Sequence, residues 1–314
     1  MKKLTHRTNQ IIVSVFLLLS ASITQISSSH EYETIYSLDK PIHVERNDQA
    51  IAAISPDFQF VTQGALTVAV APSDPPISFY AKDTKTAIGA DPDFALAIAE
   101  SLGLDLKLIP ITWIDWSLGL TGKKYDAVLA NMGVTEARKA KFDFSTYRLG
   151  LHGFYVKNSS KTTSIVEPKD ASGLRIIVGA GTNQERILLR WNKELIANGL
   201  SPITLQYYDD GAVSLLAIQS NRADVIVQPN AQLVYLAARD GNIRSVGTLS
   251  AGWPDRSDVA VVTRKNSGLA EAITLAINGL ILEGSYQKIL DKWGLGEEAL
   301  EASETNPLGL PIEK

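Results

Sequence analysis

Arg138 stands where a polar loop ends and a helix can begin. Residues 125–130 form a short apolar run typical of a buried strand, and the run from Thr135 to Arg138, Thr-Glu-Ala-Arg, can open a helix. Open α/β sheets bind ligands in loops at the carboxyl ends of their strands. In such a loop the planar guanidinium of Arg138 offers a fork of donors that suits a carboxylate. On a solvated helix turn the same side chain would bind nothing.

Three further segments accompany this loop in a fixed order. The run Leu66-Thr-Val-Ala-Val70 precedes a proline-rich loop, Gly89 to Ala95 leads into a helix, and residues 284–294, GSYQKILDKWG, stand near the end. With these segments the chain resembles extracytoplasmic solute-binding protein family 3, the polar amino acid-binding periplasmic proteins of ABC transporters. The resemblance runs from about Leu66 to Leu295, and the order and spacing of the four pieces carry it.

The resemblance implies an α/β chain with the two-lobed periplasmic binding protein fold of type II. Each lobe would be a mixed sheet flanked by helices, and two crossover strands, near residues 153–157 and 247–251, would join the lobes across a cleft. Such a protein would capture an amino acid or a related small carboxylated amine and deliver it to an ABC permease in the inner membrane. It would need no cofactor and no covalent chemistry.

In the first lobe the resemblance makes Arg138 the residue that binds the ligand's carboxylate. The position five residues earlier is usually Ser or Thr and here is Gly133, which keeps a backbone donor and loses a hydroxyl. Asn131 would supply an amide beside it. Trp113 falls where the family places an aromatic residue, whose face would attract an ammonium by about 0.5–2 kcal/mol. Since Trp116 lies close by, either tryptophan is equally suited to the core.

In the second lobe the loop Gly181-Thr182-Asn183 matches the segment that donates backbone N–H and hydroxyl groups to the ligand. The strand ending at Gln228 should then be followed by an aspartate for the ligand's ammonium, but Pro229 stands there and offers neither a carboxylate nor an N–H. Asp74 has appeared in a proline-rich loop where the family commonly has an aromatic residue. We expect Asp74 to bind the ligand's ammonium. Gln228 and Asn230 would be neutral hydrogen-bonding partners of the ligand. Asp255 and Asp258 are the alternative acids for the role of Asp74. Asp74 is equally suited to a plain surface turn.

The elements that position these residues alternate along the chain. From Leu66 strand-like apolar runs alternate with amphipathic helical stretches, and a second such series begins near Leu174; this alternation predicts sheets flanked by helices. We expect lobe 1 to comprise residues 65–154 and 252–296, and lobe 2 residues 155–251. Residues 30–64 form a polar lead-in without an assigned function. Residues 297–314 are acidic or bear proline, and we expect a mobile tail.

The N-terminal segment resembles a secretory signal. Lys2, Lys3 and Arg7 precede the apolar run from Ile11 to Leu19, and small and polar residues follow. The run is short for a membrane span, so we expect a signal peptide over residues 1–29 that is removed on export to the periplasm; a retained anchor is the alternative. The chain contains no cysteine, which excludes disulfides, thiolate metal sites and a lipid-bearing cysteine.

Composition excludes several partners. Hydrophobic content of 45% and charged content of 20% are typical of a globular protein, and 314 residues suit two domains. A net charge of −4 gives no electrostatic surface for nucleic acid or an anionic membrane. The four histidines show no ligand spacing, so we expect no metal site. We expect a monomer.

Two other functions remain open from the sequence. Periplasmic dehydratases for arogenate or prephenate share the fold and the arginine motif, and Asp74 would then be an acid or base over the ligand. A sensory binding protein that presents its ligand to a receptor would carry the same sequence features.

Overall fold

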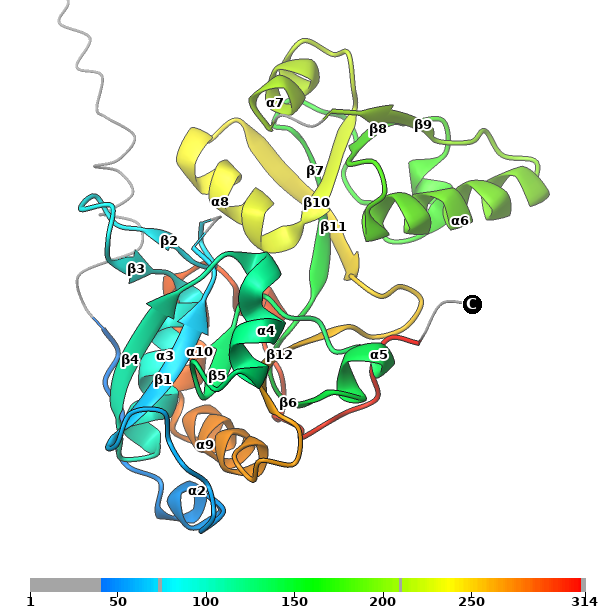
Figure 1. Ribbon diagram of the computed structural model, residues 1–314. Coiled ribbons are helices and arrows are strands. Elements are labelled where there is room, and N and C mark those ends of the chain that lie inside the picture. The colour runs from blue at the N-terminus through cyan, green and yellow to red at the C-terminus, as the bar shows by residue number, and fades with distance from the viewer. Residues whose placement is uncertain (1–40, 73–74, 209–210, 312–314) are drawn as a thin grey trace, which may run out of the picture.

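The structure is a computed structural model that describes residues 41–72, 75–208 and 211–311. Figure 1 shows two lobes, each built on its own five-stranded sheet, with two connections between them. The predicted fold class is therefore confirmed. The expected signal peptide, residues 1–29, and Asp74 lie outside the described residues.

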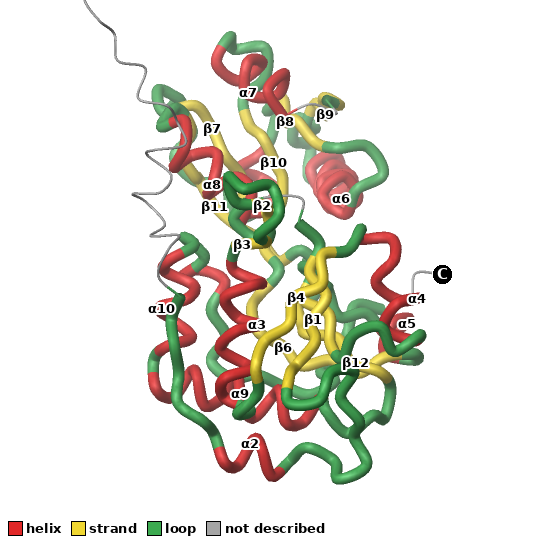
Figure 2. Tube along the Cα trace, turned by 60° about the vertical axis from the view of Figure 1, so that its left-hand side comes forward, coloured by secondary structure: helices red, strands yellow, loops and turns green. Residues whose placement is uncertain are grey.

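The first sheet has the strand order β4-β1-β5-β12-β6. Strand β1 pairs in parallel with β4 and β5, and β12 pairs antiparallel with β5 and β6. All six residues of β1 are buried because helices cover both faces of the sheet, as Figure 2 shows. The strands are β1 (Ala65–Val70), β4 (Asp105–Pro110), β5 (Ala127–Leu129), β6 (Phe142–Leu149) and β12 (Asp258–Arg264), with the small hairpin β2 (Phe79–Tyr80) and β3 (Ala87–Ile88) beside them. The helices are α2 (Asp48–Ala52), α3 (Ala90–Ser101), η1 (Trp113–Asp115), α4 (Trp116–Thr121), α5 (Glu136–Lys139), α9 (Ala270–Glu283), α10 (Ser285–Lys292) and η3 (Gly296–Glu298).

The second sheet has the strand order β11-β7-β10-β8-β9. Its core includes Phe154, whose ring stacks on Trp191 at 5.4 Å between centroids. The strands are β7 (Leu151–Lys157), β8 (Arg175–Val178), β9 (Thr204–Tyr207), β10 (Val225–Pro229) and β11 (Ile243–Ser250). The helices are η2 (Pro168–Ala171), α6 (Asn183–Ala197), α7 (Gly211–Gln219) and α8 (Asn230–Asp240).

The two connections between the sheets lie side by side. The chain passes from β6 to β7 through Gly150 and returns from β11 to β12 through residues 251–257. The Gly150 N–H donates to the Ser257 carbonyl at 2.8 Å, and the Ala251 N–H donates to the Gly150 carbonyl at 2.8 Å. A Cβ on residue 150 would come within 3.2 Å of the Ser257 carbonyl oxygen, so a glycine lets the two connections approach. We call these residues, 150 and 251–257, the hinge.

The C-terminal segment packs on the first lobe, so the expectation of a mobile tail is wrong for its described part. We call residues 296–311 the strap. The Asn306 N–H donates to the Phe144 carbonyl at 2.9 Å, and the Leu310 N–H donates to the Val134 carbonyl at 3.0 Å. Apolar periodicity is absent from this segment because hydrogen bonds to β6 and to the residues around α5 hold the strap in place.

The described part of the lead-in also packs on lobe 1. Helix α2 lies against α9 (Figure 2), and Phe58 and Phe60 pack against the first core. The expected loop and short helix are present in this part of the segment.

Candidate ligand-binding site

Arg138 lies on α5 among residues that leave its guanidinium without an acid. Thr135 caps the helix by accepting from the Arg138 N–H at 3.2 Å, and the Arg138 Nη1 donates to the Gly133 carbonyl at 2.8 Å. Across the described residues no carboxylate lies within ion-pair distance of this guanidinium. Burial lowers the pKa of Arg138, since the partly desolvated cation has no counterion. A buried cation of this kind is suited to bind the carboxylate of an external ligand.

The two tryptophans of the η1–α4 region are separated by the structure. Trp116 is 7% exposed and packs on Phe142 with ring centroids 4.7 Å apart, so it belongs to the core. Trp113 is 51% exposed, and the Arg138 Cζ lies 5.8 Å from its ring centroid. The ring face of Trp113 therefore borders the arginine that we expect to bind the ligand.

Gly133 and Asn131 lie in the loop between β5 and α5, beside Arg138. A Cβ on residue 133 would lie 3.9 Å from the Arg138 Nη1, which is an ordinary van der Waals contact. Sterically, this position would therefore accept a larger residue, and the glycine leaves open space there. Asn131 has a φ of 51°, and its N–H donates to the Asp91 Oδ2 at 3.2 Å. Its side-chain oxygen accepts from the Arg148 guanidinium. The Asn131 Oδ1 is thus already hydrogen-bonded within the protein, which leaves the side-chain NH₂ for the predicted contact with a ligand.

The second-lobe loop builds the start of α6. Thr182 is the N-cap: its Oγ1 accepts from the Glu185 N–H at 3.2 Å and donates to the Gly179 carbonyl at 2.7 Å. The Gly181 N–H donates to the Glu185 Oε2 at 2.6 Å, and the Asn183 Oδ1 accepts from Arg186. Ligand contacts by Thr182 and Asn183 stay predictions, since these polar groups serve the helix cap in the described structure.

The two neighbours of Pro229, Gln228 and Asn230, differ in burial and in hydrogen bonding. The partly exposed Gln228 side chain makes no hydrogen bond with the described residues. Asn230, in contrast, is 2% exposed; its Oδ1 accepts from the Tyr155 hydroxyl at 3.3 Å, and its Nδ2 contacts the Glu298 Oε1 at 3.5 Å. Asn230 therefore belongs to a buried polar cluster at the hinge.

That cluster is centred on an ion pair that sequence reasoning missed. The Arg148 Nη1 donates to the Glu298 Oε2, and the two side chains are 3% and 1% exposed. Burial opposes the charge of Arg148, but Glu298, Tyr147 and Asp91 outweigh it and raise the pKa of Arg148. Burial raises the pKa of Glu298, although Arg148 and Asn230 oppose this shift. The pair joins the strap to β6, 150 residues apart in the chain.

Asp91 completes the cluster from α3. It accepts from the Tyr147 hydroxyl at 2.6 Å and is fully buried, and burial raises the pKa of its carboxyl against the effect of Arg148. Asp91 followed by Pro92 is a sequence pattern that predicts an N-cap and a first helical residue, but Gly89 is the N-cap and Asp91 lies in the first turn. The prediction failed because the helix begins two residues earlier, and the Asp91 carboxylate accepts from the Tyr147 hydroxyl instead.

A cavity of about 140 Å³ lies at the hinge, next to this cluster. Both lobes and both connections contribute to its wall, which is lined by Asn131, Gly133, Arg148, Gly150, Leu151, His152, Pro229, Ala231, Ala251, Ser257, Val259 and Glu298. Gly133 thus borders both this cavity and Arg138, whereas Asn131 connects the cavity wall to Arg148.

His152 is a buried and unpartnered member of that wall. It is 6% exposed, and neither ring nitrogen completes a hydrogen bond. Burial lowers the pKa of His152 to about 4, and the nearby backbone of Ala251 opposes the shift. The imidazole is therefore neutral at neutral pH, and its acceptor nitrogen has no donor among the described residues.

Replacing His152 with glutamine should flatten the pH dependence of stability between pH 6.5 and about pH 4. Because the pKa is lower in the folded chain, the unfolded chain takes up the proton first as the pH falls, and the wild-type free energy of unfolding drops across this window. Glutamine takes up no proton, so the variant should lose less, with a difference of about 3 kcal/mol near pH 4. Arg148 and Glu298 face the same cavity in both proteins. Denaturant titrations along this pH range measure the effect, and equal slopes would contradict it.

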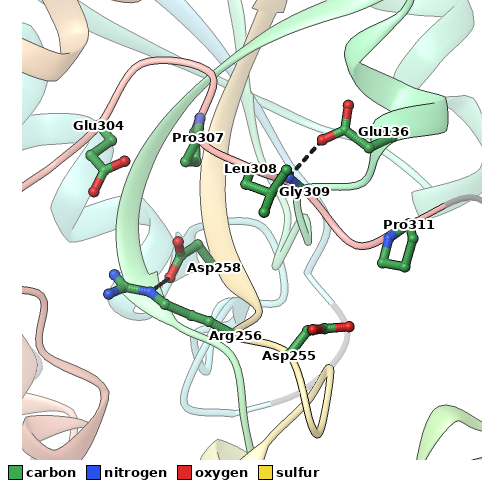
Figure 3. A pocket seen from close by; sticks show the side chains of 9 residues that line it. All are labelled: Glu136, Asp255, Arg256, Asp258, Glu304, Pro307, Leu308, Gly309 and Pro311. Atoms are coloured by element: carbon green, nitrogen blue, oxygen red, sulfur yellow. Dashed lines mark hydrogen bonds and ion pairs between the residues drawn. The ribbon is translucent and has the colours of Figure 1, made fainter.

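Asp255 and Asp258 lie in a separate groove, shown in Figure 3. The groove has a volume of about 500 Å³ and lies between α5, the strap and the start of β12. Asp258 is paired with Arg256 at 2.7 Å, and the Glu136 Oε1 accepts from the Gly309 N–H at 2.7 Å. This groove is not lined by Arg138, Gly133 or Trp113. The two alternative acids, Asp255 and Asp258, therefore line a different pocket from the one expected around Arg138.

No metal cluster and no membrane span occur in the described part of the chain. Residues 41–72, 75–208 and 211–311 contain no group of three His, Asp or Glu side chains placed to hold a metal ion. No helix in the same ranges is long and apolar enough to cross a bilayer.

Comparison with known proteins identifies similar sequences. Residues 66–296 match the family described as bacterial extracellular solute-binding proteins, family 3. The chain is 28% identical over 236 residues to the L-cystine-binding protein TcyJ of Escherichia coli K12, covering 74% of this chain and 83% of that protein. It is 27% identical over 249 residues to the arginine-binding protein ArgT of Corynebacterium glutamicum, covering 78% and 79%.

Solved structures share the architecture. An ancestral arginine-binding protein bound to arginine is 27% identical with a TM-score of 0.53, covering 74% of this chain and 98% of that one. The L-cystine solute receptor of Neisseria gonorrhoeae in the unliganded open conformation has a TM-score of 0.64 at 21% identity, covering 77% and 97%. The second likeness supports the fold alone.

Proposed function

This chain belongs to family 3 of the bacterial extracellular solute-binding proteins, and on that premise we propose that it captures an amino acid between its two lobes and delivers it to an ABC permease. The observation that carries the proposal is Arg138: a partly buried guanidinium without an acid in the described part of the chain, beside the exposed face of Trp113. The binding proteins among its relatives are named for cystine, arginine and glutamine. All three ligands carry an amino acid head group with an α-carboxylate and an α-ammonium, and cystine carries two. Arg138 is suited to bind the carboxylate of such a head group.

Capture requires no chemistry on the ligand. A solute that touches both lobes binds the closed form better than the open form, and this difference in affinity shifts the population toward closure. The hydrogen-bonded connections at Gly150 and Ala251 give the lobes a common place to bend. We therefore favour binding without turnover over the dehydratase alternative, since the relatives in the comparison are named as binding proteins.

A binding screen tests the proposal. Purified protein is heated with L-cystine, L-arginine or L-glutamine, and each hit is measured by calorimetry. A ligand at about a hundred times its dissociation constant should stabilise the folded state by about 2.7 kcal/mol. The amide of the same amino acid, which lacks the α-carboxylate, is the matched control and should bind far more weakly because it offers nothing to Arg138. Failure of every amino acid to shift the melting temperature would contradict the proposal.

We further propose that residues 1–29 direct export to the periplasm and are then removed, and that the mature chain acts as a monomer. The motive is the short apolar run from Ile11 to Leu19 behind Lys2, Lys3 and Arg7. N-terminal sequencing of the protein released by osmotic shock should begin after about residue 20. Recovery of the uncleaved chain in the membrane fraction would favour a retained anchor.

A further inference from the structure

The hinge cavity adjoins the expected carboxylate site through one residue. Gly133 lines the cavity, and its carbonyl accepts the hydrogen bond from the Arg138 Nη1 at 2.8 Å. The volume of about 140 Å³ equals that of several water molecules at about 30 Å³ each, which fits a head group and not a long side chain. Arg138 itself does not line the cavity, so a ligand held by Arg138 would have to extend past Gly133 to place a neighbouring polar group in it.

The charges of the buried cluster beside the cavity do not balance. Two buried carboxylates, Asp91 and Glu298, share one buried guanidinium, that of Arg148, and of the two only Glu298 lines the cavity. Burial raises the pKa of both carboxyl groups, and Arg148 opposes the shift in each. An added cation would relieve this excess.

The hydrogen-bonding capacity of the wall is also incomplete. The Glu298 Oε2 accepts a hydrogen bond from the Arg148 guanidinium. Among the described residues, the Oε1 of the same carboxylate accepts only the long 3.5 Å contact from the Asn230 amide. The acceptor nitrogen of the buried His152 has no donor among the described residues. One carboxylate oxygen and one neutral imidazole nitrogen are thus free to accept from an N–H donor in the cavity.

We propose that Glu298, carried on the strap, receives the ammonium group of the ligand whose carboxylate binds Arg138. The inference rests on the proposed function and deepens it, because it restricts the ligand to amino acids with a free α-ammonium. Pro229 lines the same cavity and offers no charge. Glu298 supplies that charge from the C-terminal segment.

The experiment compares two ligands and three variants. The probes are whichever of L-cystine, L-arginine and L-glutamine binds the wild type most tightly, and the acid of the same skeleton that lacks the amino group. Calorimetry gives the ratio of the two affinities for wild type, Glu298→Gln, Asp74→Asn and Glu297→Gln. Glu297 is the exposed neighbour of Glu298, so its variant makes the same charge change outside the cavity.

Glu298→Gln should reduce the ratio by at least about thirty-fold, with most of the loss in the affinity for the amino acid. Glu297→Gln should leave the ratio unchanged. Equal losses for both probes, or no loss, would overturn the inference, as would a collapse of the ratio in Asp74→Asn alone. If Glu298→Gln does not fold, Glu298→Asp provides the test. The shorter side chain keeps the negative charge for Arg148 but withdraws it from the cavity, so the ratio should fall several-fold. An unchanged ratio in Glu298→Asp would also overturn the inference. If no amino acid binds the wild type, the proposed function itself fails, and the inference with it.

Discussion

Replacing Arg138 with alanine should lower the affinity for the captured amino acid by roughly thirty-fold to several thousand-fold while the protein stays folded. The guanidinium is partly buried and makes its described side-chain hydrogen bond to the Gly133 carbonyl, so its removal leaves the ligand's carboxylate without a counterion. Stability should change little, because within the described residues no ion pair depends on Arg138. Calorimetry with the wild-type ligand, alongside a thermal melt, measures both quantities.

Two matched variants sharpen this result. Lys141→Ala removes an exposed cation three residues away and should leave affinity nearly unchanged. Arg138→Lys keeps the charge but loses the planar fork, so it should recover only part of the affinity. Near-normal binding by a folded Arg138→Ala protein would remove Arg138 from the site.

Replacing Arg148 with methionine should lower the free energy of unfolding by about 3–5 kcal/mol. The substitution leaves the Glu298 carboxylate buried without its partner and also removes the donor to the Asn131 side-chain oxygen. Denaturant titration of the wild type and the variant measures the loss.

A partly exposed pair provides the control for this prediction. Arg239 and Asp240 lie 2.6 Å apart with side chains 33% and 24% exposed, so Arg239→Met should cost at most about 1 kcal/mol. A similar small loss in Arg148→Met would show that the buried pair contributes no more than a surface pair does.

The sequence predicted the parts of the site that local patterns encode. The strand, polar loop and helix start around Arg138 follow from residues 125–138 alone. In the structure the Gly133 carbonyl and the Trp113 ring lie beside the guanidinium, and their contacts with a ligand stay predictions. Trp113 and Trp116 were not separable beforehand, because both stand in one short helical stretch and only tertiary packing on Phe142 decides which is core.

The hinge cluster was beyond sequence reasoning for a physical reason. Glu298 lies in an acidic segment whose composition is typical of an exposed tail, yet it is 1% exposed because Arg148 compensates its charge from a distant strand. The vacancy at Pro229 was visible in the sequence. The sequence therefore favoured Asp74 as the acid that replaces the missing aspartate, because Asp74 stands at a position where the family commonly has a residue that covers the ligand. The position of residue 298 in the chain gives no sign that it lies near the hinge.

The strap also has a consequence for association between molecules. Strand β6 is the outermost strand of its sheet, and an outermost strand normally presents unpaired N–H and C=O groups that a second chain can join. Here Thr305 bridges to Ser145, the Thr146 N–H donates to the Glu304 carbonyl at 3.1 Å, and the Asn306 N–H donates to the Phe144 carbonyl at 2.9 Å. This edge of the sheet is therefore already paired, and the strap removes one route by which a second molecule could add a strand to it.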